Sequence, residues 1–472
     1  MGSNYRFYAD VMAMHSGVTG SCNFVIAKFP SGETARLVVD CGLFQEEEYA
    51  EYNKDLQFIP ENVNFVLAIH VHVDHVGRLP YMVEHGYRGP IYVTEDTSKL
   101  LPLALMDSCK VLNQVARRNN EKSLYFEDDV ERTLSLVKQP VVFNKTIEIH
   151  PNIKVTFFKN GHLIGAACIL VQISYPGEND INLFFTGDYN KKNLFFDVED
   201  IPKWVLDLPL TVIQESTYGN MNSTSITKCF KKNILSHISN GGAVVAPVFS
   251  LGRAQEILYL LKTMQDENEL SSIIPIYLDG KLAIRYTGYY TTKMVGIKEE
   301  MLDFLPRNLT FVDRKTRNEV VNKNEKKIIL TTSGMGSYGP AQTYIPEYIN
   351  RKKALIQFTG YTAEGTLGNR LKEAKKGEMV EIAGLMCKKQ ADVEYTTEFS
   401  AHAKADEMID FLKQFTNLKL VLVNHGEPET KKIFAERIAE EVKTKNVGLL
   451  GREYFFRVNP YGLVKTLNTK FK

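Results

Sequence analysis

The segment HVHVDH, residues 70–75, places three histidines and an aspartate within six positions. It follows the apolar run NFVLAI, which predicts a strand that ends where the polar residues begin. Alternate residues of an extended segment point the same way, so His70 and His72 can share one metal ion, while Asp74 and His75 lie in the following turn and face a second. Burying such a cluster is costly unless cations neutralise it. The segment therefore predicts metal ligands.

Two further residues extend this candidate site. His162 in NGHLIGAA and Asp188 in FFTGDYN each follow a strand-like run. In a two-metal hydrolytic site the cations lie about 3.5–4 Å apart, where they can bind one hydroxide and stabilise both the attacking and the leaving oxygen. A carboxylate that binds both ions holds them at that spacing. Asp188 suits that bridging role. Zinc is the favoured ion because imidazole dominates the ligand set, although manganese or iron also fits a nitrogen and oxygen site of this kind.

The pattern around these residues predicts the elements that position them. Residues 24–42 are typical of two strands around a Pro-Ser-Gly turn, residues 98–119 have helical spacing, and strand patterning returns in residues 141–188. We therefore expect a mixed sheet with covering helices in the first ~200 residues. Beyond Glu215, strands and helices alternate as in a parallel sheet. Because histidines recur after residue 393, we expect the C-terminal part to return to the first domain and the middle to be an insertion.

Composition excludes several classes of protein. Of the 472 residues, 44% are hydrophobic and 24% charged, so disorder, collagen-like repeats and coiled coil do not describe the chain. The formal net charge of +1 shows no overall basic excess, so any contact with nucleic acid must come from a local patch. No apolar run approaches ~18 residues and no signal peptide opens the sequence, so we expect a cytoplasmic protein without a membrane segment. The six cysteines form no CxxC pair and are expected to be buried free thiols.

The order of the motifs resembles that of the metallo-β-lactamase superfamily. Asp40 in VVDCG, the segment HVHVDH, His162 and Asp188 match the first four motifs of that family in order. Glu215 in QESTYGN, His402 in EFSAHA and His425 in VNHGE resemble the A, B and C motifs of its β-CASP branch. Together with VTGSC, HVGRLPY, APVFSLGRAQE, TTSGM and GYTAEGTLG, these motifs extend the resemblance over nearly the whole chain.

This resemblance implies an α/β fold, namely an αββα metallo-β-lactamase sandwich with an inserted β-CASP α/β domain whose parallel sheet is flanked by helices. We expect residues 1–208 and 393–472 to form the metallo-β-lactamase domain and residues 209–392 the insertion. The resemblance also assigns ligands: His70, His72 and His162 to one ion, Asp74, His75 and His425 to the other, and Asp188 as a bridge between two zinc ions. Asp40 would orient ligands without binding an ion.

The resemblance implies catalytic roles as well. His402 would protonate the leaving oxygen, and Glu215 would fix its tautomer and raise its pKa, so these two join Asp74 and Asp188 as expected catalytic residues. Five residues in presumed turns are candidates for binding phosphate, although turn chemistry explains them equally well: Ser250, Arg253, Ser333, Gly334 and Ser400. His15, His85, His150 and His237 lie outside the motifs and are expected to be structural or exposed.

The expected function is zinc-dependent phosphodiester hydrolysis in RNA processing, acting on single-stranded RNA from within, from the 5′ end, or both. His425 favours RNA because the C motif resembles that of RNA-processing members, whereas DNA-repair members tend to carry valine there. The alternatives are a small-molecule hydrolase of the lactonase or thioesterase type, a DNA nuclease of the same branch, and a non-catalytic scaffold. The sequence leaves open whether the chain forms a homodimer or binds protein partners.

Overall fold

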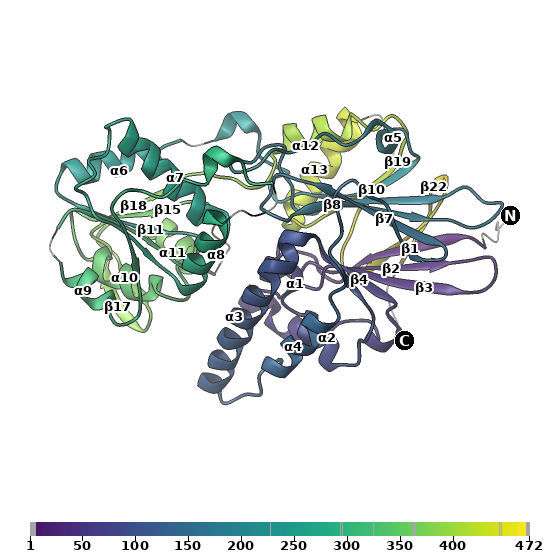
Figure 1. Cartoon of the computed structure of the whole chain (residues 1–472), viewed down its shortest axis with the longest axis horizontal. Helices are drawn as coiled ribbons and strands as arrows, with labels where there is room; N and C mark the ends of the chain where they lie inside the picture. The colour runs from purple at the N-terminus through teal and green to yellow at the C-terminus, as the bar shows by residue number, and fades with distance from the viewer. Residues whose placement is uncertain are drawn as a thin grey trace. The chain divides into compact units, whose positions relative to one another are not determined.

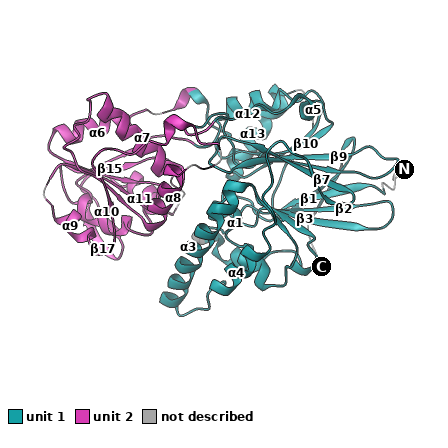
Figure 2. Ribbon diagram, in the orientation of Figure 1, with its two compact units in different colours: residues 1–193, 197–223, 401–472 teal, residues 194–196, 224–400 magenta. Residues whose placement is uncertain are grey.

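The computed structural model describes residues 6–468 except 227, 293, 295, 324, 361, 363, 364, 443 and 445. The chain forms two compact units (Figure 2). The first takes in residues 1–193, 197–223 and 401–472, and the second residues 194–196 and 224–400. The C-terminal segment therefore returns to the first unit, and the middle of the chain is an insertion. The boundaries expected at residues 208/209 and 392/393 stay predictions.

The first unit contains two seven-stranded sheets (Figure 1). In order across the first sheet, the strands are β22 (Gly462–Asn468), β21 (Tyr454–Asn459), β1 (Tyr8–Ala13), β2 (Asn23–Lys28), β3 (Thr34–Val39), β4 (Phe65–Leu67) and β5 (Ile91–Tyr92). The second sheet runs β20 (Val447–Leu449), β19 (Leu418–Asn424), β10 (Leu210–Glu215), β9 (Ile181–Phe185), β8 (Ala167–Ile173), β7 (Ile153–Lys159) and β6 (Ile147–His150). Strands β1–β3 and β6–β9 are antiparallel meanders, whereas β9, β10, β19 and β20 are parallel neighbours.

The inner faces of the two sheets share one hydrophobic core. Leu37 and Leu67 from the first sheet lie in the same buried cluster as Leu183 and Phe185 from the second. Phe184, between these last two, belongs to a different cluster on the other face of the second sheet. Because successive side chains of a strand alternate between faces, a strand buried on both faces must be apolar throughout, as INLFF is.

Helices cover the outer faces of this sandwich (Figure 1). On the second sheet lie α5 (Lys203–Leu206), α12 (Ala405–Leu412) and α13 (Pro428–Glu441), which contribute Val205, Met408 and Phe434 to the outer cluster. On the side of the first sheet lie α1 (Val73–Val76), α2 (Leu79–Glu84), α3 (Glu95–Asn119) and α4 (Glu127–Ser135). The 3-10 helices Glu47–Lys54 and Pro60–Asn62 lie between β3 and β4 in the chain. This is the four-layer αββα arrangement that the resemblance implies.

The helix expected over residues 98–119 is confirmed as α3. The Thr94 side chain accepts a hydrogen bond from the Thr97 backbone N–H at its start, and Glu95 and Asp96 occupy the first turn, where the helix dipole favours negative charge. Arg117 lies in the last turn, and the helix ends where Asn120 adopts a left-handed conformation.

The second unit is built on a six-stranded parallel sheet. Its strand order is β13 (Leu309–Val312), β12 (Ile276–Asp279), β14 (Lys327–Thr331), β11 (Ala243–Pro247), β15 (Leu355–Phe358) and β18 (Asp392–Tyr395). Its helices are α6 (Phe230–Ser239), α7 (Arg253–Asp266), α8 (Lys281–Thr291), α9 (Arg317–Asn322), α10 (Ala341–Ile349) and α11 (Leu367–Glu373). Strands β16 (Met379–Ile382) and β17 (Leu385–Lys388) form a hairpin, and Glu299–Met301 is a 3-10 helix. The 3-10 helix Ser223–Ser225 begins in the first unit and ends in the second. The parallel sheet expected from the alternating strands and helices is confirmed.

Two further expectations concern the state of the cysteines and the presence of a membrane-spanning helix. Five cysteines are buried and Cys229 is half-buried, and all six are free thiols, as predicted. Among the described residues, no helix combines the length and the apolar character that crossing a membrane requires.

Candidate metal centre and active site

The candidate site lies where parallel strands of the first unit end. Glu215 is the last residue of β10, His425 directly follows β19, and Asp188 comes three residues after β9. These three strands are parallel neighbours, so their carboxyl ends meet at one edge of the second sheet. In the first sheet, β3 and β4 are also parallel, which brings Asp40 and the 70–75 segment to a common edge.

The 70–75 segment is held by the strand ends beside it. The backbone N–H of Cys41 donates to the His75 carbonyl over 2.7 Å, and that of Ser21 donates to the Asp74 carbonyl over 2.8 Å. A Cβ atom on Gly42 would lie 1.6 Å from the Asp74 carbonyl oxygen, so only glycine allows this approach. Backbone contacts therefore hold the 70–75 segment in place.

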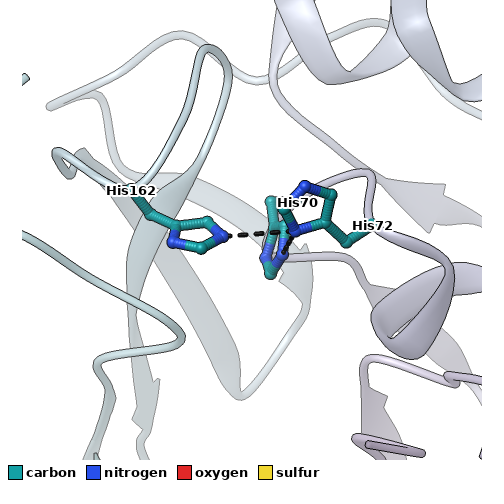
Figure 3. Close-up of side chains that lie close together, drawn as sticks. All are labelled: His70, His72 and His162. Atoms are coloured by element: carbon teal, nitrogen blue, oxygen red, sulfur yellow. Dashed lines mark hydrogen bonds between the residues drawn. The ribbon is translucent and has the colours of Figure 1, made fainter. Parts of the chain in front are cut away.

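His70, His72 and His162 direct ring nitrogens at one another (Figure 3). His72 Nδ1 lies 3.2 Å from His70 Nε2 and 3.3 Å from His162 Nε2. Three nitrogens bound tetrahedrally to zinc at about 2.0–2.1 Å would be separated by roughly 3.3 Å, so the observed spacing fits such an ion. Without a cation, the nitrogen lone pairs that converge here repel one another, because a single N–H cannot donate a hydrogen bond to both of the other nitrogens.

A second group combines Asp74, His75, Asp188 and His425, with one ligand atom from each within 4.8 Å of the others. His75 Nε2 lies 3.1 Å from Asp188 Oδ2, and His425 Nδ1 lies 3.0 Å from Asp188 Oδ1. Asp188 Oδ2 is also 3.9 Å from both His70 Nε2 and His162 Nε2. The Asp188 carboxylate therefore faces both groups. Its Oδ1 atom and His425 Nε2 are buried without a hydrogen-bond partner among the described residues, which is a state that a bound cation would relieve.

Burial keeps the first histidine group neutral. It lowers the pKa of His70 and His162 well below the usual 6.5, and it lowers the pKa of His72 to about 4. The neighbouring imidazoles add to the effect of burial on His70. Because only a neutral imidazole has a lone pair to offer, these three residues are ready to bind a cation at neutral pH.

In the second group, charged neighbours outweigh burial and favour the charged forms of His75 and Asp188. Burial alone would lower the pKa of His75, but Asp188 and Asp40 outweigh it and raise the pKa well above 6.5. Burial disfavours the charged form of Asp188, yet His425 and His75 overcome it and hold the pKa of that carboxyl well below its usual range. Asp188 is therefore a carboxylate at neutral pH, and a cation bound by this group would compete with the proton on His75.

Residues outside the two groups fix which ring nitrogen His75 and His162 direct at them. Asp40 Oδ2 lies 2.7 Å from His75 Nδ1, and Asp40 Oδ1 accepts a hydrogen bond from the Ile69 N–H. His162 Nδ1 lies 3.1 Å from the Ala401 carbonyl oxygen, which can only accept. With Nδ1 protonated in both rings, Nε2 of His75 and of His162 is left to face the ligand groups.

His402 contacts a carboxylate outside the two groups. Its Nδ1 lies 3.1 Å from both oxygens of Glu215, and its Nε2 lies 4.0 Å from Asp188 Oδ2. Glu215 is itself held by backbone N–H groups of Tyr189 and Thr217. Burial opposes protonation of His402, but Glu215 and then Asp188 outweigh it and raise the pKa of the ring above 6.5. His402 also completes a third potential ligand group with His162 and Asp188.

The residues expected to bind phosphate lie in the second unit. Ser250 and Arg253 follow β11, and Ser333 and Gly334 follow β14, its parallel neighbour. The side chains of Arg253 and Ser333 have partners within that unit. The Arg253 guanidinium donates to the Thr359 carbonyl and to Glu256, and it lies over the Phe399 ring. The Ser333 hydroxyl oxygen accepts from the Tyr338 N–H, and a Cβ atom on Gly334 would meet Phe249. Ser400 is half-buried at the end of the same unit.

Sequence reasoning did not place three residues beside the two groups, one of which, His15, was expected to be structural or exposed. His15 is fully buried, and its ring centroid lies 6.2 Å from that of His425. Asn160 donates to the Asp188 carbonyl and accepts from the His162 N–H. Thr217 places its hydroxyl 3.2 Å from His425 Nδ1. Asn160 and Thr217 each lie two residues from a residue that we had singled out, and this proximity in sequence is the signal that could have identified them.

Family models match three stretches of the chain. A metallo-beta-lactamase superfamily domain matches residues 31–193, a Beta-Casp domain residues 254–371, and a Zn-dependent metallo-hydrolase RNA specificity domain residues 387–448. The chain is also 30% identical over 424 residues to Ribonuclease TTHA0252 of Thermus thermophilus, covering 87% of this chain and 91% of that protein. The chain belongs to the β-CASP branch of the metallo-β-lactamase superfamily.

Other β-CASP relatives are longer proteins. The transcription termination factor FttA of Methanosarcina mazei is 28% identical over 444 residues, covering 89% of this chain and 67% of the relative. Integrator complex subunit 11 of Danio rerio is 29% identical over 422 residues, covering 86% of this chain and 67% of the relative. The β-CASP fold expected from the motifs is confirmed, and a Zn-dependent family together with the histidine and aspartate groups supports metal binding.

Proposed function

We propose that this β-CASP protein is a metal-dependent ribonuclease that hydrolyses phosphodiester bonds of single-stranded RNA. The observation that carries the proposal is the His402–Glu215 pair beside the two ligand groups. His402 belongs to neither of the two proposed ligand sets, so it remains available as a proton donor when the ions are bound. The RNA specificity domain matched at residues 387–448 and the relative named as a ribonuclease support RNA as the substrate.

We assign His70, His72 and His162 to one cation, Asp74, His75 and His425 to a second, and Asp188 to both. Two zinc ions fit the imidazole-rich donor set, and manganese or iron are the alternatives. Bound divalent cations would activate water and neutralise the charge that develops on phosphate. Asp40 would orient the His75 ring through its 2.7 Å contact with Nδ1.

His402, together with Glu215, would protonate the leaving group. Glu215 holds Nδ1 of His402, so Nε2 of the protonated ring would give its proton to the departing ribose oxygen. Glu215 and Asp188 raise the pKa of His402 above its usual value, so the ring holds that proton to a higher pH than an ordinary histidine does. As the P–O bond breaks, the electron pair goes to the ribose oxygen and the proton follows, so no unprotonated alkoxide leaves. Proton transfer of this kind contributes about 10²–10⁴-fold to a rate.

The proposal is tested with metal-loaded protein and RNAs labelled at either end, carrying a 5′ phosphate or a 5′ hydroxyl. We expect RNA cleavage that a chelator abolishes and added zinc restores. The earliest products separate the two modes: internal fragments mean endonuclease action, and single nucleotides from the 5′ end mean exonuclease action. A DNA strand of the same sequence and a lactone panel run in parallel. Intact RNA alongside turnover of DNA or lactone would overturn the proposal.

A further inference from the structure

Asn160 is a buried residue that joins two segments of the first unit, each of which carries an expected metal ligand. It directly follows β7, two residues before His162, and its side chain is only 2% exposed. Its Oδ1 atom accepts a hydrogen bond from the His162 backbone N–H over 3.1 Å. Its Nδ2 atom donates to the Asp188 carbonyl over 3.0 Å and to the Thr186 carbonyl over 3.4 Å. One carboxamide therefore binds the backbone of both ligands.

These partners fix the orientation of the Asn160 carboxamide. The His162 N–H can only donate, and the carbonyl oxygens of Asp188 and Thr186 can only accept. A flipped amide would set its NH₂ group against the N–H and its oxygen against both carbonyls. The position therefore requires a short side chain that accepts on one side and donates on the other, which asparagine provides.

The backbone joins the same two segments at a neighbouring point. The Gly161 N–H donates to the Asn190 carbonyl over 2.8 Å, and a Cβ atom on Gly161 would lie 2.4 Å from that oxygen. Among the described residues, however, no backbone–backbone hydrogen bond reaches the His162 N–H or the Asp188 carbonyl. Loss of the Asn160 side chain would therefore release the backbone at the two ligands, while the contact at Gly161 still keeps the segments together.

We propose that Asn160 is a positioning residue that sets the spacing between His162 and Asp188. His162 Nε2 lies 3.9 Å from Asp188 Oδ2. Two atoms that bind one zinc ion at about 2.0–2.2 Å lie at most roughly 4.4 Å apart, so a small separation of the two segments would take one of them away from the ion. The inference rests on the proposed function in one respect only, namely that His162 and Asp188 are ligands of a common ion.

The experiment compares two substitutions that remove different parts of the carboxamide. Asn160→Ala loses the contacts with both ligands. Asn160→Ser keeps an oxygen that can accept from the N–H two residues further on, but its shorter side chain does not reach the Asp188 carbonyl. Each metal-free protein is titrated with zinc against a competing chelator, which gives the affinities without reference to RNA cleavage. Loss of such supporting contacts typically weakens metal binding 10–100-fold, so we expect both variants to bind at least one ion about 10–100-fold more weakly than wild type.

Asn182→Ala is the matched control for a general loss of stability. Asn182 is also a buried asparagine of the first unit, and it lies near the start of β9, whereas Asp188 follows the end of that strand. Its side chain donates to the Pro209 carbonyl and accepts from Gln172. Its replacement should lower the thermal unfolding temperature of the metal-free protein, as replacement of Asn160 does, but should leave both zinc affinities as in wild type.

The outcomes separate this inference from the proposed function. Wild-type zinc affinities in Asn160→Ala or Asn160→Ser, or an equal weakening in Asn182→Ala, would overturn the inference. If Asn160→Ala does not fold, Asn160→Ser decides between the same outcomes. Wild-type protein that binds two ions but leaves RNA intact would overturn the proposed function alone, and wild-type protein that binds no ion would overturn both.

Discussion

Nδ1 of His402 lies 3.1 Å from both carboxylate oxygens of Glu215, although 187 positions of sequence separate the two residues. Glu215 ends a strand of the second sheet, and His402 lies in the loop before α12, beyond the whole inserted unit. The contact joins the two parts of the chain that flank the insertion. It also leaves the other nitrogen of His402 facing Asp188, which is the arrangement that a proton donor beside a metal centre requires.

Replacement of His402 by alanine separates the proton donor from the metal ligands. We expect His402→Ala to retain both ions and to cleave RNA about 10²–10⁴-fold more slowly, because a protonated imidazole no longer meets the leaving oxygen. Elemental analysis and initial rates on end-labelled RNA measure the two effects. His85→Ala, at an exposed histidine, is the control and should change neither. An ion lost from His402→Ala would make His402 a ligand, as its position in the third group allows.

Glu215→Gln removes the charge beside His402 and keeps the size of the side chain. Burial lowers the pKa of His402 and Glu215 raises it, so losing the charge lowers the pKa. The proton donor is then lost at a lower pH, and the high-pH limb of the kcat profile should move to lower pH, with a fall of about 10–100-fold at neutral pH. Measuring kcat from pH 5 to 9 locates the pH at which this high-pH limb falls. An unchanged limb in a variant that still binds both ions would refute the pairing.

Asp188 is predicted to hold both ions together. Asp188→Ala should lose metal and activity at once, because the carboxylate faces both ligand groups and its removal takes away the negative partner of His75 Nε2 and of His425 Nδ1. Zinc content per chain after dialysis measures the loss. Glu178→Ala, at an exposed acid earlier in the chain, should keep the wild-type content. Two ions retained by Asp188→Ala would contradict a bridging role.

Lys327 predicts a pH dependence of stability in the second unit. Burial lowers the pKa of its ammonium to about 8 from the usual 10.5, while its Nζ donates to the carbonyl oxygen of Val320. Between these two pKa values the unfolded chain binds more protons than the folded chain, so this group makes the free energy of unfolding rise with pH. From pH 7.5 to 9.5 the rise should be about 1–2 kcal/mol.

The rise is measured by urea unfolding at both pH values, as the difference between wild type and Lys327→Met. The methionine variant has no titrating group there, so its stability should lack this increment. Lys326→Met, at the exposed neighbouring lysine, should follow wild type. Equal pH slopes for wild type and Lys327→Met would show that Lys327 titrates as an exposed lysine does.

The local part of the site could be predicted from the sequence. The 70–75 segment follows an apolar strand, and the two-residue period of extended chain already directs His70 and His72 to one side. Strands β2, β3 and β9 and helix α3 also lie where patterning indicated, because hydrophobic periodicity reflects the face that each element buries. The resemblance to β-CASP proteins added the distant residues His402 and His425, which periodicity alone does not connect to the segment.

Only the tertiary structure decided which atoms meet. The parallel pairing of β10 with β9 and β19 brings Glu215, Asp188 and His425 to one edge, and the sequence of a single strand does not specify its non-local partners. The contacts of Thr217 with His425 and of Arg253 with Thr359 depend likewise on where separate strands end. Sequence determined the residue types and their local spacing, because backbone geometry acts over a few residues. The fold determined the tautomers, the shifted pKa values and the distances between the polar atoms, because these depend on neighbours that are distant along the chain.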